Sequence, residues 1–81
     1  MKNIIMYTTA HCFKCKMTKK YLAEKGIVIE ERLVDQNEDY LNEMRKMNIL
    51  SVPVLVCEEM IVTDNSKAEI DKMIEYAKEA I

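Results

Sequence analysis

The chain has 81 residues, of which 49% are apolar and 32% charged, with one glycine, one proline and a net charge of −2. This length and composition indicate a single globular domain over residues 1–81, with a small core and short loops, and exclude a disordered chain. No apolar run approaches the ~20 residues needed to cross a bilayer, so we expect no contact with membranes.

The start of the chain lacks the pattern of a signal peptide, so we expect a cytoplasmic protein. Its three cysteines are an odd number and do not form a disulfide framework. Residues 1–25 hold six lysines against Glu24, a balance of +5 that leaves −7 for the rest. This basic part is expected to attract anions, although a solvated helix face also explains it. The acidic total and the lack of interleaved aromatic residues predict no binding of nucleic acid.

The first half of the chain predicts a strand, a helix and a second strand. Residues 4–7 are an apolar run typical of a buried strand. Residues 13–25 have helical periodicity, and Gly26 fits a left-handed cap at the end of the helix. Residues 27–34 predict a second strand, parallel to the first because a helix connects the two. The expected inward stripe of the helix is Phe13, Met17, Tyr21 and Leu22.

The second half predicts a helix, a hairpin and a last helix. Residues 35–37 offer N-cap candidates for a helix over 38–47, whose inward residues are Leu41, Met44 and Met47. Residues 54–57 and 60–62 flank Glu58-Glu59 and predict an antiparallel hairpin. Ser66 and Glu69 match a capping box before a helix. Its apolar stripe consists of Ile70, Met73, Ile74, Ala77 and Ile81. The element order β-α-β-α-β-β-α indicates an α/β fold.

The pair Cys12 and Cys15 stands at the expected junction between the first strand and the first helix. Two thiols three residues apart can cycle between a dithiol and a disulfide. Free backbone N–H groups and the positive end of the helix dipole favour a thiolate there, most strongly at Cys12. We therefore expect Cys12 to attack a substrate disulfide and Cys15 to resolve the mixed disulfide, while Lys14 and Lys16 help to hold the negative charge.

Pro53 starts a predicted core strand and is preceded by Ser51-Val52. A proline has no N–H, so it leaves an unpaired backbone position beside it, where an extended substrate can pair. An ordinary proline at the start of a strand explains the residue equally well.

The cysteines also allow three metal-binding alternatives. His11, Cys12, Cys15 and Cys57 total four soft ligands for zinc, but adjacent side chains diverge, and Cys57 in an apolar run is typical of a small buried residue. A copper-chaperone domain has a different element order and leaves Pro53 unexplained. An iron-sulfur cluster shared by two subunits through Cys12 is the stronger alternative. Our prediction is that the chain has no resident metal.

The segment 7–15, the tripeptide Ser51-Val52-Pro53 and the element order together resemble glutaredoxins and the similar NrdH-type redoxins over essentially the whole chain. This resemblance implies a thioredoxin-like fold, with a four-stranded mixed sheet flanked by three helices. It also implies that Pro53 is cis and lies against the cysteines, and that the Val52 main chain pairs with the bound disulfide or glutathione.

The sequence departs from the glutaredoxin pattern at three places. Phe13-Lys14 stand where Pro-Tyr is usual, Thr63-Asp64 replace a double glycine, and Thr9 replaces a lysine that contacts a glutathione carboxylate. Lys14 is the candidate to supply that contact. NrdH-type redoxins carry a glutamine in the active-site loop and a tryptophan near the last helix, and this chain has no tryptophan. The electron donor therefore stays open between glutathione and a thioredoxin-reductase-type flavoprotein.

The expected activity is the reduction of protein disulfides or glutathione mixed disulfides, with no tightly bound cofactor and with glutathione as a candidate co-substrate. Ribonucleotide reductase is a target by family analogy, and we expect a monomer. The candidate substrate-binding residues are Lys14, Val52, Pro53, Thr63 and Asp64. The candidate supporting residues are Tyr7, expected half-buried beneath the active-site loop, His11, expected exposed to solvent, and Phe13.

Overall fold

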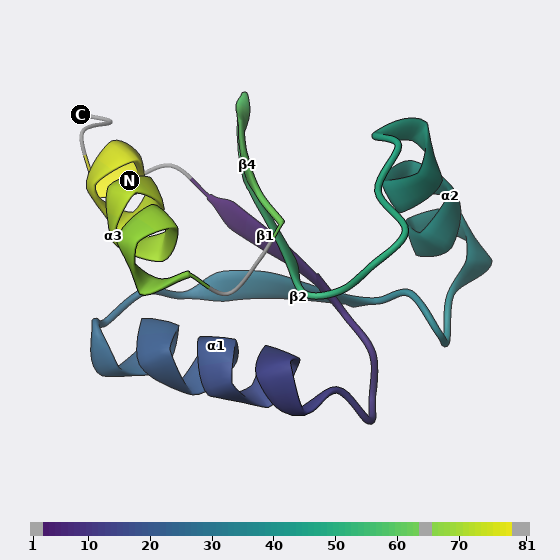
Figure 1. The fold of residues 1–81 in the computed structure, drawn as a ribbon, viewed down its shortest axis with the longest axis horizontal. Coiled ribbons are helices and arrows are strands. Elements are labelled where there is room, and N and C mark those ends of the chain that lie inside the picture. Colours follow the sequence, from purple (N-terminus) through teal and green to yellow (C-terminus); the bar gives the residue numbers. More distant parts are fainter. Residues whose placement is uncertain (1–2, 64–65, 79–81) are drawn as a thin grey trace.

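The computed structural model describes residues 3–63 and 66–78. In these residues the chain forms four strands and three helices in the predicted order (Figure 1). Their bounds are β1 (Ile4–Thr8), α1 (Phe13–Glu24), β2 (Ile29–Leu33), α2 (Glu38–Lys46), β3 (Val54–Cys57), β4 (Met60–Val62) and α3 (Lys67–Lys78). For the first six elements, the predicted bounds differ from these by at most two residues.

The strands form one mixed sheet in the order β2-β1-β3-β4. The β1 and β2 strands are parallel, as the connecting helix requires, and β3 is antiparallel to both β1 and β4. The hairpin occupies its predicted residues, and Glu58 takes a positive φ of 54° in its turn. Because β4 therefore runs in the direction of β1, the carboxyl ends of these two strands lie at the same edge of the sheet.

The helices cover both faces of the sheet, with α1 and α3 on one face and α2 on the other (Figure 1). Alternate strand residues serve the two faces: Ile4 and Met6 pack with α1 and α3, while Tyr7 and Val54 pack with α2. The α3 stripe is buried as predicted at Ile70, Met73, Ile74 and Ala77, and Ile81 lies outside the described residues. The result is a three-layer α/β fold.

The helix ends follow local chemistry. Gly26 has a φ of 74°, which confirms the left-handed cap after α1. Among the N-cap candidates for α2, Asn37 is the cap, and its side chain accepts the Asp39 N–H at 2.9 Å. The capping box of Ser66 and Glu69 stays a prediction.

The predicted inward stripe of α1 is wrong at two of its four positions. Phe13 is 74% exposed and Met17 50% exposed, while Cys15, Thr18 and Leu22 are buried. A threonine can replace an apolar residue on the inner face because its hydroxyl donates to the Lys14 carbonyl at 2.9 Å. The apolar side chains of Phe13 and Met17 are consequently left at the surface.

Candidate active site

The two thiols lie where three segments of the sheet meet. The loop over residues 9–12 leaves the carboxyl end of β1, and Tyr7 near that end pairs with Val54, the first residue of β3. Val52 and Pro53 directly precede Val54, and Thr63 directly follows β4 at the same edge. The fold therefore brings the cysteines, the proline segment and Thr63 to one edge of the sheet.

Cys12 is the N-cap residue of α1 and is partly exposed. Its Sγ accepts the backbone N–H of Cys15 at 3.1 Å. A sulfur in this position replaces the oxygen of an ordinary cap and points at the unpaired N–H groups of the first turn. The predicted position of Cys12 at the start of the helix is therefore confirmed.

Cys15 lies in the first turn of α1 and is only 1% exposed. Burial raises the pKa of its thiol to about 12, and the hydrogen bond to Cys12 and the negative charges of Cys12 and Glu31 act in the same direction. A backbone hydrogen bond with Thr9 partly opposes this increase in pKa. The Cys15 thiol is therefore protonated at neutral pH. The two sulfurs are chemically unequal, with Cys12 the accessible one.

A polar cluster around Glu31 lies close enough to Cys15 to affect its pKa, and it was not predicted from the sequence. The Thr8 hydroxyl donates to Glu31 Oε2 at 3.1 Å, and Lys19 Nζ lies 2.8 Å from the same oxygen. Thr8 is buried, whereas the Glu31 side chain is 32% exposed. The position of Glu31 could have been predicted from the alternation of side chains along β2, which puts Glu31 on the same face as Ile29, the face that α1 covers.

The loop that carries Cys12 forms a hydrogen bond with the segment that follows the carboxyl end of β2. The Ala10 N–H donates to Asp35 Oδ2 at 3.2 Å. Asp35 was predicted only as a candidate cap for α2, and the structure gives that role to Asn37. Sequence alone did not reveal this contact, because Ala10 and Asp35 meet only when β1 and β2 pair.

The remaining predicted site residues divide into three groups. Pro53 is buried, its peptide bond with Val52 is cis as the resemblance implied, and Val52 packs against the core cluster that contains Cys15. Lys14, Thr63 and His11 are exposed, and an exposed loop position is what we predicted for His11. Asp64 lies outside the described residues.

Tyr7 differs from its predicted placement. It is buried at 5% exposure rather than half-buried, and its hydroxyl donates to Glu43 Oε1 on α2 at 2.9 Å. Arg32 Nη1 lies 2.6 Å from the same carboxylate oxygen and 3.4 Å from the Tyr7 hydroxyl. Burial raises the pKa of Tyr7, and its hydrogen bond to Glu43 adds to this increase. The side chain thus belongs to the α2 face of the sheet, opposite the face that contains Cys15.

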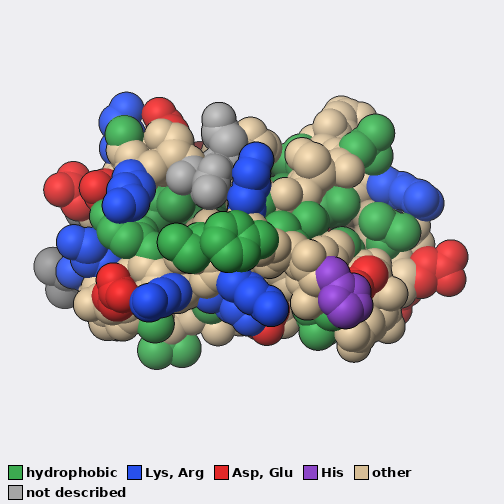
Figure 2. Space-filling view, turned by 60° about the horizontal axis from the view of Figure 1, so that its bottom comes forward, with side chains coloured by type: hydrophobic (Ala, Val, Ile, Leu, Met, Phe, Trp, Pro, Cys, Tyr) green, Lys and Arg blue, Asp and Glu red, His purple; other side chains and the backbone are tan. Residues whose placement is uncertain are grey.

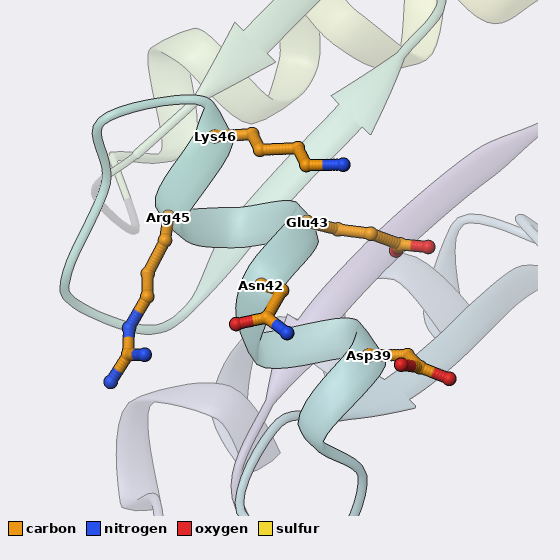
Figure 3. A pocket seen from close by; sticks show the side chains of 5 residues that line it. All are labelled: Asp39, Asn42, Glu43, Arg45 and Lys46. Atoms are coloured by element: carbon orange, nitrogen blue, oxygen red, sulfur yellow. The ribbon is translucent and has the colours of Figure 1, made fainter.

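A surface hollow of about 540 Å³ lies along α2 and is lined by Asp39, Asn42, Glu43, Arg45 and Lys46. Figure 3 shows that all five side chains come from this single helix and that Arg45 points away from Glu43 and Lys46. The hollow contains no thiol and lies on the α2 side of the sheet, opposite the face that contains Cys15, so it is not the candidate redox site.

Over residues 3–63 and 66–78, no three His, Cys, Asp or Glu side chains are grouped in a way that could hold a metal ion. The alternative zinc set of His11, Cys12, Cys15 and Cys57 is therefore not grouped in these residues. In the same residues, no helix is long and apolar enough to cross a membrane.

A thioredoxin-like fold with one accessible and one buried thiol at the start of α1 defines a dithiol redoxin. The sequence pattern of the glutaredoxin family matches residues 4–62. The chain belongs to the glutaredoxin family.

A glutaredoxin-like 8.6 kDa protein of the rubredoxin operon of Clostridium pasteurianum is 40% identical over 73 residues, which cover 89% of this chain and 97% of that protein. Two solved structures share the fold. A mutant of the thioredoxin-like protein BC3987 has a TM-score of 0.84 at 21% identity, covering 93% of this chain and 97% of its own. The glutaredoxin-like NrdH-redoxin of Escherichia coli has a TM-score of 0.81 at 21% identity, covering 88% and 93%.

Proposed function

We propose that this protein reduces protein disulfides and glutathione mixed disulfides, with Cys12 as the nucleophile and Cys15 as the resolving thiol. The observation that carries this proposal is the inequality of the two sulfurs. Cys12 is partly exposed at a helix N-cap, and Cys15 is buried with a pKa raised to about 12. A sulfur that a substrate disulfide can reach therefore lies beside a buried thiol that is protonated at neutral pH.

The reaction has two exchange steps. The Cys12 thiolate attacks one sulfur of the substrate disulfide, a bond forms between them, and the other substrate sulfur leaves as a thiolate. Cys15 then loses its proton and attacks Cys12 Sγ, which releases the second substrate sulfur and leaves a Cys12–Cys15 disulfide. Two electrons have passed to the substrate, and a donor must return them.

Formation of the mixed disulfide is expected to favour the second step, because it changes the groups that set the pKa of Cys15. It removes the Cys12 negative charge and the Cys12 side-chain hydrogen bond, both of which raise the pKa of Cys15 in the reduced protein. The backbone hydrogen bond with Thr9, which lowers that pKa, remains. The resolving thiol is therefore easier to ionise once its partner has reacted.

The substrate is expected to pair with the Val52 main chain beside cis-Pro53, with Lys14, Thr63 and Asp64 around it. The donor is glutathione or a thioredoxin-reductase-type flavoprotein. The resemblance aligns Thr63-Asp64 with the double glycine of glutathione-binding members, and this departure in sequence favours the second donor. Relatives named NrdH suggest ribonucleotide reductase as one target.

Two coupled assays test the proposal in parallel, one with glutathione and glutathione reductase and one with thioredoxin reductase, both followed through NADPH oxidation. We expect disulfide reduction with at least one donor, and its loss in Cys12→Ser. Absence of reduction with both donors would refute the oxidoreductase function. A coloured preparation with stoichiometric iron would instead support the cluster-binding alternative.

A further inference from the structure

The exposed apolar side chains of α1 are not explained by the disulfide exchange. Phe13 and Met17 are 74% and 50% exposed, and they lie four residues apart, on the same face of α1. They line a groove of about 400 Å³ between α1 and the start of α3. The complete lining is Phe13, Met17, Thr18, Lys20, Tyr21, Glu24, Lys67 and Ile70.

The groove begins beside the reactive thiol. Phe13 directly follows Cys12, and Ile70 in the lining belongs to the core cluster against which Cys12 packs. From Phe13 to Glu24 the groove follows eleven residues of α1, a rise of about 16 Å. About five residues of extended polypeptide have this length. A short extended segment of polypeptide therefore fits along the groove.

Lysines surround the groove. Lys20 and Lys67 line it, Lys25 Nζ and Lys67 Nζ lie 5.4 and 5.5 Å from the centroid of the Tyr21 ring, and Lys14 and Lys16 stand exposed beside the cysteines. The opposing charges are Glu24 in the lining and Asp71, which accepts the Tyr21 hydroxyl proton in a hydrogen bond. Figure 2 looks onto the side of the molecule that carries α1 and shows a band of hydrophobic side chains with basic side chains on either side.

We propose that the groove between α1 and α3 is a docking site for an acidic segment of the protein substrate, in which an apolar side chain is flanked by carboxylates. The apolar side chain packs against Met17 and Phe13, and the carboxylates face the lysines. This inference rests on the proposed function and adds to it the class of substrate that the protein selects. It also explains why Phe13 and Met17 of α1 are exposed to solvent.

The test uses two synthetic peptides, each with one cysteine in a mixed disulfide with thionitrobenzoate and one leucine about four residues away. The leucine is flanked by glutamates in one peptide and by lysines in the other, and bis(2-hydroxyethyl) disulfide serves as a small neutral substrate. We expect kcat/KM for the acidic peptide to exceed that for the basic peptide about tenfold, and to fall as salt is added. Replacement of the leucine by serine should remove most of the preference.

Two variants address the groove itself, Met17→Ser for its apolar wall and Lys67→Glu for its charge. Each should lower kcat/KM for the acidic peptide about five- to tenfold and leave the small disulfide unaffected. Lys46→Glu makes the same charge change on an exposed residue of α2 and should alter neither rate. Circular dichroism establishes that each variant is folded, and the salt dependence of the wild type requires no variant.

Equal rates with the two peptides, or equal losses in Lys67→Glu and Lys46→Glu, would overturn the docking proposal while leaving the exchange chemistry intact. A concentration-dependent dimer that Met17→Ser dissociates would also overturn it, because the groove would then hold a second copy of the chain. Failure of the proposed function has a different result: the wild type would reduce none of the three disulfides.

Discussion

The two faces of the sheet differ in how their polar groups are paired. On the face covered by α1 and α3, Cys15 is buried with a raised pKa, and its charge partner Cys12 is accessible. On the face covered by α2, Tyr7 and Arg32 both bond to Glu43, so each polar group is satisfied by another side chain. The Cys12 sulfur is thus accessible to a substrate, whereas the polar side chains of the α2 face are bonded to one another. We therefore expect the unequal thiols to give the face covered by α1 and α3 its reactivity and the paired groups of the α2 face to contribute to stability.

Loss of the thiols should give the largest effect on the reactive face. We expect Cys12→Ser to lower disulfide exchange by at least about a thousandfold, because it removes the nucleophile. Cys15→Ser should keep the first step and accumulate the mixed disulfide, which mass spectrometry detects as a covalent adduct. Substantial dithiol activity in Cys12→Ser would reverse the assignment of the two roles.

The second step should depend steeply on pH. Because Cys15 must lose its proton before it attacks, the thiolate fraction rises about tenfold per pH unit below the pKa that Cys15 has in the mixed disulfide. The rate at which Cys15 releases the second substrate thiol should therefore rise with pH over the neutral to mildly alkaline range. Stopped-flow measurement on a preformed mixed disulfide gives this rate, and a flat profile would show that deprotonation does not limit it.

Variants of the neighbouring residues Glu30 and Glu31 allow the two faces to be compared directly, because their side chains lie on opposite sides of β2. The Glu31 charge raises the pKa of Cys15, whereas Glu30 pairs with Arg32 on the α2 face. Glu31→Gln should lower the pKa of Cys15 and accelerate its attack about two- to threefold at pH 7, a modest effect because Glu31 is partly exposed and paired with Lys19. Glu30→Gln is the matched control and should leave that rate unchanged. Equal acceleration in both variants would contradict the separation of the two faces.

The smallest effect is expected on the α2 face. Tyr7→Phe removes the buried hydroxyl that donates to Glu43, and should lower the free energy of unfolding by about 1 kcal/mol. The exchange rate at 25 °C should not change. Urea denaturation and a single-turnover assay measure the two quantities, and a slower exchange with unchanged stability would place Tyr7 in the active site after all.

The sequence predicted the fold closely because its signals are local. The apolar run of β1, Gly26 after α1 and the hairpin around Glu58 each depend on nearby residues, and all are present in the structure. The inward face of α1 was predicted wrongly, since Thr18 is buried through a hydrogen bond to its own helix. Local hydrophobicity does not contain that information.

The sequence predicted the two cysteines of the candidate site but not the polar residues that surround them. The spacing of Cys12 and Cys15 identifies the thiols, and the resemblance identified the cis bond before Pro53. Glu31 and Asp35 meet the active-site region only after β1 and β2 pair, so their contacts are tertiary and leave no motif in the chain. The partner of the Tyr7 hydroxyl lies 36 residues away for the same reason.

The measurement that tests the inequality of the two thiols most directly is timed alkylation of the fully reduced protein with iodoacetamide, mapped by mass spectrometry from pH 7 to pH 11. The structure predicts that Cys12 is modified at neutral pH, while Cys15, buried and with a pKa raised to about 12, reacts appreciably only toward the alkaline end. Modification of Cys15 at neutral pH as fast as Cys12, in the folded protein, would contradict the account.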